Sequence, residues 1–138
     1  KQKVYCRTYT AETVAEKTDL LRKTALEATR IYGADTTRRM YFIEHTFSQS
    51  GTLAFCASVP YRSEGENIVE IPTFSAICMY HHGAYEKLPE AVEKLVKYAE
   101  KNRIQILDKC RFAFLEGPPQ HRKKDKFITQ VIIPIKEI

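Results

Sequence analysis

An internal repeat constrains the fold most strongly, because the second half of the chain reproduces the order of segments found in the first half. An offset of 72 residues places Cys6 on Cys78 and the segment RMYFIEH on RFAFLEG. When the offset is increased by two residues, Val59-Pro60 aligns with Ile133-Pro134. Since one sequence repeat is one supersecondary unit, we expect each half to fold into the same short motif.

The motif predicted for each half is strand–helix–strand–strand (βαββ). In the first half, apolar residues recur at helical spacing up to Gly33, which is a helix-ending residue. The residues of this stripe are Val14, Leu21, Ala25, Ala28 and Tyr32. In the second half, a similar apolar stripe follows Pro89, a residue that fits the first turn of a helix. Runs rich in β-formers and bounded by turn residues predict strands, over residues 4–9, 39–47 and 52–59, and again over residues 75–81, 110–116 and 127–135.

These elements predict one α+β domain over residues 1–138. Its half-repeats run over about 1–61 and 73–138, with a polar linker at about 62–72 in which residues 68–71 fit either a short strand or an extended linker. Helices must cover one face of an antiparallel sheet, and two copies of one unit usually pack about a pseudo-twofold axis. We therefore expect an antiparallel sheet, two helices, and a ligand pocket between the halves.

Composition excludes several classes of protein. An apolar content of 43% can bury a core, and a net charge of +5 permits an anionic partner without demanding one. No apolar run approaches the roughly 20 residues of a membrane span, and no export leader opens the chain. We expect a soluble cytoplasmic protein with no membrane contact, and the first residue, Lys1, suggests a processed chain or a fragment of a longer one.

The cysteines and histidines do not form a recognisable metal or redox motif. Cys6, Cys56, Cys78 and Cys110 lie far apart in apolar segments, which predicts small buried residues in a reducing compartment rather than disulfides. The adjacent His81 and His82 would point to opposite faces of a strand. Neither a glycine-rich phosphate loop nor a GxSxG motif is present, so we expect no metal, no cofactor and no catalytic residue.

One predicted strand combines two phenyl rings with a carboxylate. Because side chains alternate along a strand, Phe112, Phe114 and Glu116 share a face, and Phe42 and Glu44 have the same spacing in the first half. Rings around a lone acid suit a flat hydrophobic cation, through cation–π attraction and charge complementarity. The rings also fit ordinary core positions and the acid an exposed strand end, so the residues alone leave both interpretations open.

Aromatic residues near element ends add further candidates. A tyrosine in such a position can present its ring to a ligand and its hydroxyl to water, although most tyrosines simply straddle core and surface. The tyrosines in such positions are Tyr9, Tyr32, Tyr61, Tyr80 and Tyr85. The additional candidate ligand contacts are Tyr9, Tyr32, Tyr61 and Tyr85, together with Phe55 from the strand predicted over residues 52–59.

With these residues in view, the chain resembles the GyrI-like effector-binding domains, the ligand-sensing half of many MerR-type and some AraC-type transcription regulators. The segment IPTFSAICMYHHGAYEKLPEAVEKLVKYAEKN resembles the family's strand, H-x-G-x-Y-E-x-L turn and second helix. The tail RFAFLEGPPQHRKKDKFITQVIIPI resembles its aromatic strand ending in an acid and its last strand. The chain departs from the family pattern in having no Trp and in reading Gly83-Ala84-Tyr85 where Gly-Pro-Tyr is usual.

The resemblance implies a duplicated βαββ fold with a pocket for hydrophobic, often cationic, aromatic compounds. It implies Glu116 as the pocket acid, with Phe112, Phe114 and Tyr85 beside it and Tyr9 and Tyr32 nearby. DNA would be contacted only through a domain outside this chain, before Lys1, and a homodimer would form through the parent protein. Two alternatives stay open: a hydrolase of electrophilic natural products with Glu116 as general base, and a protein-binding inhibitor of the gyrase-inhibitor type.

Overall fold

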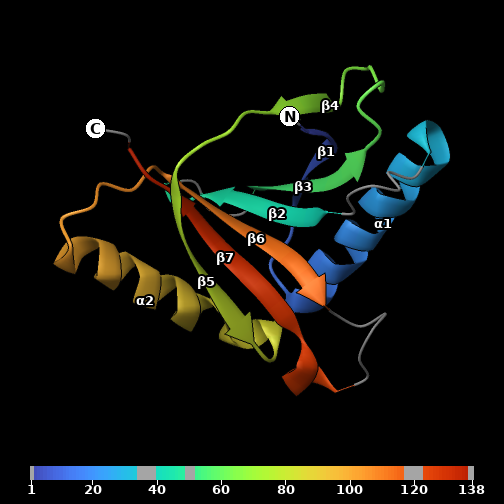
Figure 1. Cartoon of the computed structure of the whole chain (residues 1–138). Helices are drawn as coiled ribbons and strands as arrows, with labels where there is room; N and C mark the ends of the chain where they lie inside the picture. The colour runs from blue at the N-terminus through green and yellow to red at the C-terminus, as the bar shows by residue number, and fades with distance from the viewer. Residues whose placement is uncertain (1, 34–39, 49–51, 117–122, 137–138) are drawn as a thin grey trace. The chain divides into compact units, whose positions relative to one another are not determined.

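The computed structural model describes residues 2–33, 40–48, 52–116 and 123–136, which fall into two compact units (Figure 1). The first unit comprises residues 1–45 and 49–73, and the second comprises residues 46–48 and 74–138. Each unit contains the predicted order of strand, helix, strand and strand. The predicted α+β class is therefore confirmed, with antiparallel strand pairing within each unit.

The first unit is a sheet with the strand order β4-β1-β3-β2 and one helix packed on it. Residues 68–71, which the sequence left between strand and linker, form an edge strand that pairs with the first strand of the chain. The elements of this unit are β1 (Gln2–Thr10), α1 (Val14–Tyr32), β2 (Tyr41–Thr46), β3 (Thr52–Val59) and β4 (Ile68–Ile71).

Local sequence explains both ends of α1. The backbone N–H of Glu16 donates to Thr13 Oγ1 at 3.1 Å, and the Thr13 N–H donates to Glu16 Oε1 at 3.2 Å, which is a capping box. At the other end, Gly33 has a φ of 86° and donates its N–H to Thr29 O. Gly33 therefore ends the helix as predicted, because a positive φ strains residues that carry a Cβ.

The core of the first unit lies between α1 and its sheet. Ala28 of α1 packs on Tyr5, Ala57 and Val59 from the two central strands, and all four are buried. Thr24, also on α1, is completely buried and donates its hydroxyl to Leu20 O at 2.8 Å. The predicted helical stripe identified Ala28 but missed Thr24, since a threonine counts as polar in a periodicity argument.

The second unit has the strand order β6-β7-β5 with its helix packed on one face. Pro89 lies in the first turn of that helix as predicted. The helix residues Leu88, Ala91 and Leu95 pack against Val131 and Ile133 of the central strand, which have no exposed surface. The elements are β5 (Ala76–His82), the short helix η1 (Tyr85–Lys87), α2 (Leu88–Lys101), β6 (Lys109–Glu116), η2 (Lys124–Lys126) and β7 (Ile128–Pro134).

Two strands are shorter than predicted. The strand expected over residues 39–47 begins at Tyr41 and ends at Thr46, because the N–H of Phe47 donates to Asp108 O; Arg39 lies outside the described residues. The strand expected over residues 127–135 covers Ile128–Pro134, and Ile135 makes only an isolated bridge to Ile106.

The cysteines are not uniformly buried as predicted. Cys56 and Cys110 are buried and Cys6 is partly exposed, whereas Cys78 is exposed. Ile77 and Met79, its neighbours on β5, pack against the core beneath α2. Because side chains alternate along a strand, Cys78 lies on the face of the sheet away from that core.

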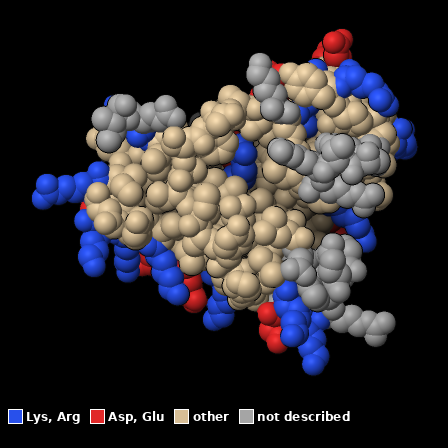
Figure 2. Space-filling model, viewed as in Figure 1, with Lys and Arg blue, Asp and Glu red and all other residues tan. Residues whose placement is uncertain are grey.

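The charges of α2 are mixed. In Figure 2, basic and acidic side chains stand out together along the side of the molecule where α2 lies. Lys97 and Glu93 form an ion pair at 3.0 Å, and Lys87 and Glu90 approach to 3.8 Å.

Within the described part of the chain, neither helix combines the length and the apolar composition that a membrane span needs.

Candidate functional site

The turn between β5 and α2 positions a tyrosine ring over the second unit's sheet. The His81 ring makes a hydrogen bond of 3.0 Å to Ala84 O, and the Gly83 N–H donates to Phe127 O at 2.8 Å. Gly83 has a φ of 122°, a conformation that favours glycine. The spacing of the H-x-G-x-Y-E-x-L motif thus has a structural reason: it fixes the turn that places Tyr85 at the start of η1.

Tyr85 is the centre of an aromatic cluster, which we define as Tyr85, Phe114 and Phe127. The ring centroids of Tyr85 and Phe127 are 5.0 Å apart with the planes inclined by 29°, and Phe114 meets Tyr85 edge-on at 5.3 Å. Burial raises the pKa of the Tyr85 hydroxyl. No hydrogen bond of this hydroxyl is found among the described residues.

A buried hydroxyl without a hydrogen-bond partner among the described residues lies beside the cluster. Thr129 on β7 is directly opposite Phe114 on β6 and His81 on β5, so the three side chains share the face that packs against α2. Thr129 has no exposed surface, and its Oγ1 lacks a hydrogen-bond partner among the described residues. Such a group costs free energy unless a ligand or a water satisfies it.

Replacing Thr129 by Val should raise the free energy of unfolding by about 1 kcal/mol, because the change removes an unsatisfied buried hydroxyl without changing the shape of the side chain. Urea denaturation measures the difference. The control is Thr24→Val, since Thr24 is equally buried but its hydroxyl is hydrogen-bonded; this variant should gain nothing. A loss of stability in Thr129→Val would mean that the hydroxyl is satisfied in solution.

Phe112 and Phe114 are part of the second unit's packing as well as ligand candidates. Both rings are partly buried and pack against the core cluster beneath α2. The structural interpretation that the sequence left open, a place at the core, is therefore correct for both rings. Their partial exposure still leaves part of each ring accessible, so a role in ligand contact stays a prediction.

The side chain of Glu116, the predicted pocket acid, lies outside the described residues. Its backbone closes β6, and the pairing register shifts between Phe114 and Glu116: Phe114 is opposite Thr129, whereas Glu116 is opposite Ile128. This shift is a β-bulge or a similar irregularity. The strict alternation from which a face shared with Phe114 was predicted does not extend across it.

The face occupied by Phe42 differs from that of its repeat partner Phe114. Phe42 is opposite Cys56, whose neighbour Ala57 packs beneath α1, so Phe42 and Glu44 lie on the sheet face away from that helix. Phe114 lies on the helix-facing side of its own sheet. The repeat is confirmed for the order of the elements, but the 72-residue alignment does not match faces at these strands.

Tyr9 and Phe55 meet in the first unit. Their ring centroids are 5.8 Å apart in an edge-on contact, and Phe55 has no exposed surface. Two cations already lie over the Tyr9 ring: the Arg7 guanidinium at 5.8 Å and the Lys23 ammonium at 5.5 Å. Like charges repel, so this ring is less suited to a cationic ligand than the aromatic cluster of the second unit.

Tyr32 and Tyr61 lie apart from this contact. Tyr32 packs against Tyr5 with ring centroids 5.7 Å apart, beside the core of the first unit. Tyr61 is 50% exposed; its hydroxyl donates to Glu70, and the Lys3 ammonium lies 4.8 Å from its ring centroid. Both rings therefore have structural partners, and among the described residues the ring contacts of Tyr32 and Tyr61 do not include Tyr9 or Phe55.

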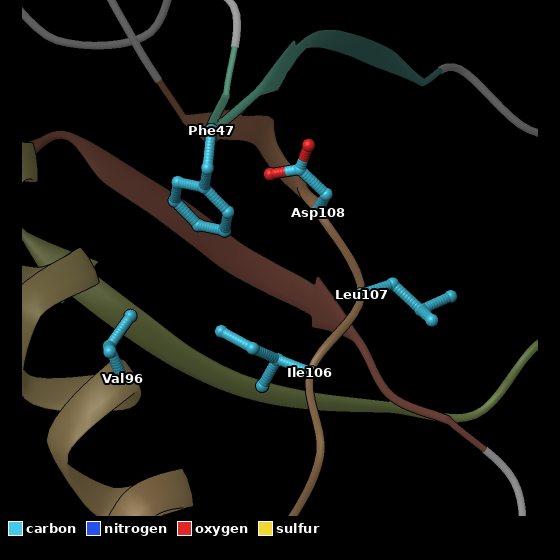
Figure 3. Close-up of a pocket in the computed structure, with 5 residues that line it drawn as sticks. All are labelled: Phe47, Val96, Ile106, Leu107 and Asp108. Carbon is cyan, nitrogen blue, oxygen red and sulfur yellow. The ribbon is translucent and has the colours of Figure 1, made fainter.

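The second unit contains a hollow that was not predicted from the sequence. It has a volume of about 370 Å³ and is lined by Phe47, Val96, Ile106, Leu107 and Asp108. Figure 3 shows the side chains of Phe47, Val96 and Ile106 pointing into a common space, whereas Leu107 points away. Ser48 donates to both carboxylate oxygens of Asp108. The adjacent apolar residues Ile106 and Leu107, outside any regular element, were the available signal.

No three His, Cys, Asp or Glu side chains gather as potential metal ligands in the ranges that the structure describes. The aromatic cluster itself offers the ring faces of Tyr85, Phe114 and Phe127 and the Tyr85 hydroxyl for recognition. Such a surface fits apolar and aromatic molecules.

The fold matches several solved structures. The crystal structure of the EcmrR C-terminal domain matches with a TM-score of 0.88 and 18% identity, covering 99% of this chain and 92% of that one. EcmrR in a cryo-EM complex with DNA matches with a TM-score of 0.81 and 17% identity, and there the chain spans 55% of the regulator. SAV2435 bound to tetraphenylphosphonium matches with a TM-score of 0.57 and 11% identity, covering 98% and 88% of the two chains.

These matches show the fold of this chain, which is the α+β fold of the EcmrR C-terminal domain. A comparison with curated protein sequences gives no match. The family model described as the GyrI-like small molecule binding domain matches residues 37–136, and this chain therefore belongs to the GyrI-like family. The resemblance stated from the sequence is confirmed.

Proposed function

We propose that this chain is the ligand-sensing domain of a cytoplasmic transcription regulator and that it binds hydrophobic, cationic aromatic molecules. The family is a small-molecule-binding one, and the fold is that of the EcmrR C-terminal domain. The observation that carries the proposal is the aromatic cluster of Tyr85, Phe114 and Phe127, whose central ring the family motif positions. Ring faces attract cations, and SAV2435 was solved with a lipophilic aromatic cation.

In this proposal Glu116 supplies the negative charge and the aromatic cluster supplies the apolar surface. Contact with DNA belongs to a separate domain of the full regulator, as EcmrR is found in a DNA complex in which this fold forms only part of the chain. The ligand changes transcription only if it binds one orientation of the regulator more tightly than another. A homodimer formed by the parent protein would carry that change to the DNA.

The proposal predicts that Glu116→Gln weakens binding of tetraphenylphosphonium by about 10- to 150-fold, the loss expected when a charged partner of a cation is removed in a site shielded from water. Binding of the neutral triphenylphosphine oxide should change much less. Titration calorimetry of the purified chain measures both affinities. The expected difference comes from charge alone, because the substitution preserves the size of the side chain.

Glu44→Gln is the matched control, since Glu44 holds the equivalent repeat position on the face away from α1. This variant should bind tetraphenylphosphonium as the unmodified chain does. Equal loss for both ligands in Glu116→Gln would show that Glu116 is not the charge sensor. If the unmodified chain bound neither ligand, the proposed function itself would be wrong.

A further inference from the structure

Two cysteines that are 50 positions apart in the sequence lie directly opposite each other in the first unit. Cys6 on β1 and Cys56 on β3 are register partners, on the sheet face away from α1. The Cys6 N–H donates to Asn67 O at 2.8 Å, so this amide points away from β3. The two cysteines therefore form a non-hydrogen-bonded pair, the kind in which opposed Cα atoms are closest, at about 4.5 Å.

The sulfur atoms are close enough to bond with little movement. The distance between Cys6 Sγ and Cys56 Sγ is 2.7 Å, against about 2.04 Å in a disulfide bond. Disulfides also require Cα atoms about 4.4–6.8 Å apart, and the non-hydrogen-bonded pair of a sheet meets this requirement. The strand register therefore already brings the two cysteines to the Cα separation that a disulfide needs.

The other two cysteines provide an internal comparison. Cys78 lies on β5 and Cys110 on β6, and β7 separates these two strands in the sheet order. Cys110 is in the core beneath α2, whereas Cys78 is exposed on the opposite face. These two thiols therefore cannot meet in the folded second unit.

We propose that Cys6 and Cys56 form a site of reversible oxidation that closes a disulfide when the chain meets a peroxide. Cys6 is the partly exposed thiol and Cys56 is buried, so Cys6 meets the oxidant first. The Cys6 thiolate attacks a peroxide oxygen and becomes a sulfenic acid, releasing water; the Cys56 thiolate then attacks that sulfur and displaces a second water. In total, two thiols lose two electrons and two protons to one hydrogen peroxide.

The bond would join β1 to β3, the two central strands of the first unit's sheet. It closes a loop over residues 6–56, which contains α1 and β2. A cross-link around a loop of this length restricts the unfolded chain far more than the folded one. Oxidation should therefore stabilise the first unit, and this inference stands independently of which ligand the chain binds.

The experiment treats the full chain with hydrogen peroxide, removes the excess with catalase, and alkylates the remaining thiols in denaturant. We expect peptide mapping by mass spectrometry to find Cys6 joined to Cys56, with Cys78 and Cys110 still alkylated. The oxidised chain should melt at least about 5 °C higher than the reduced one. Dithiothreitol should reverse both changes.

Cys6→Ser should abolish the cross-link and the shift in melting temperature, and Cys78→Ser should change neither. Should Cys6→Ser fail to fold, the peptide map of the unmodified chain still decides the question, because it identifies the joined residues directly. Recovery of Cys6 and Cys56 as separate alkylated or overoxidised residues, or pairing of Cys6 with another cysteine, would overturn the proposal.

Discussion

Phe55→Ala should lower the free energy of unfolding by about 3–5 kcal/mol, the usual cost of removing a fully buried phenyl ring. Phe55 has no exposed surface, and it lies on the face of β3 beneath α1, where it contacts Tyr9 edge-on. The substitution would leave a cavity that the sheet cannot fill without distortion. Urea denaturation followed by circular dichroism measures the change.

Leu26→Ala is the control for this prediction. Leu26 is 65% exposed on α1, and its replacement should change stability by less than about 0.5 kcal/mol. A loss below about 1 kcal/mol in Phe55→Ala would contradict the core assignment and return Phe55 to the ligand candidates. With no exposed ring surface in the structure, we expect Phe55→Leu to leave tetraphenylphosphonium binding unchanged.

Local sequence signals predicted the fold well where a single residue determines the outcome. Gly33 and Pro89 fix the end of one helix and the beginning of the other through backbone conformation alone. The strand at residues 52–59 was also predicted correctly, because β-formers lie between Gly51 and Pro60. Such signals act within a few residues of the chain, so they can be recognised without knowledge of the tertiary structure.

Strand pairing was harder to predict, because it depends on residues far apart in the chain. The direct opposition of Cys6 and Cys56 follows from the register of β1 against β3, and no local pattern specifies that register. The irregularity between Phe114 and Glu116 had the same character: a single extra residue in one strand changes which side chains share a face. Alternation correctly grouped Phe112 with Phe114 but could not be continued to Glu116.

The sequence predicted only two of the three residues of the aromatic cluster as ligand contacts. Tyr85 and Phe114 were predicted as ligand contacts, but Phe127 was read only as part of a strand. It precedes β7 and stacks on Tyr85 because its carbonyl accepts the Gly83 N–H, which draws the two turns together. The family motif therefore acts through a backbone hydrogen bond to a distant segment, and this contact carries no sequence pattern of its own.

Tyr85 is the central ring of the proposed ligand site. We therefore expect Tyr85→Ala and Tyr85→Phe to differ sharply in stability and in ligand affinity. Loss of the whole ring should lower the free energy of unfolding by about 2–3 kcal/mol, because Tyr85 is partly buried against the core beneath α2. It should also weaken tetraphenylphosphonium binding by about 5- to 30-fold, through lost ring contact. Tyr85→Phe keeps the ring and should preserve both properties, as measured by urea denaturation and calorimetry.

The pH dependence of stability distinguishes the contribution of the Tyr85 hydroxyl from that of its ring. Burial raises the pKa of Tyr85 in the folded chain, so the ionised form favours unfolding; the stability linked to this group is complete below its unfolded pKa of about 10 and declines as the pH rises above it. Tyr85→Phe has no such group and should lose less stability between neutral and strongly alkaline pH. If Tyr85→Phe bound tetraphenylphosphonium as weakly as Tyr85→Ala, the hydroxyl and not the ring face would be the recognition element, and a cation–π site at the aromatic cluster would be excluded.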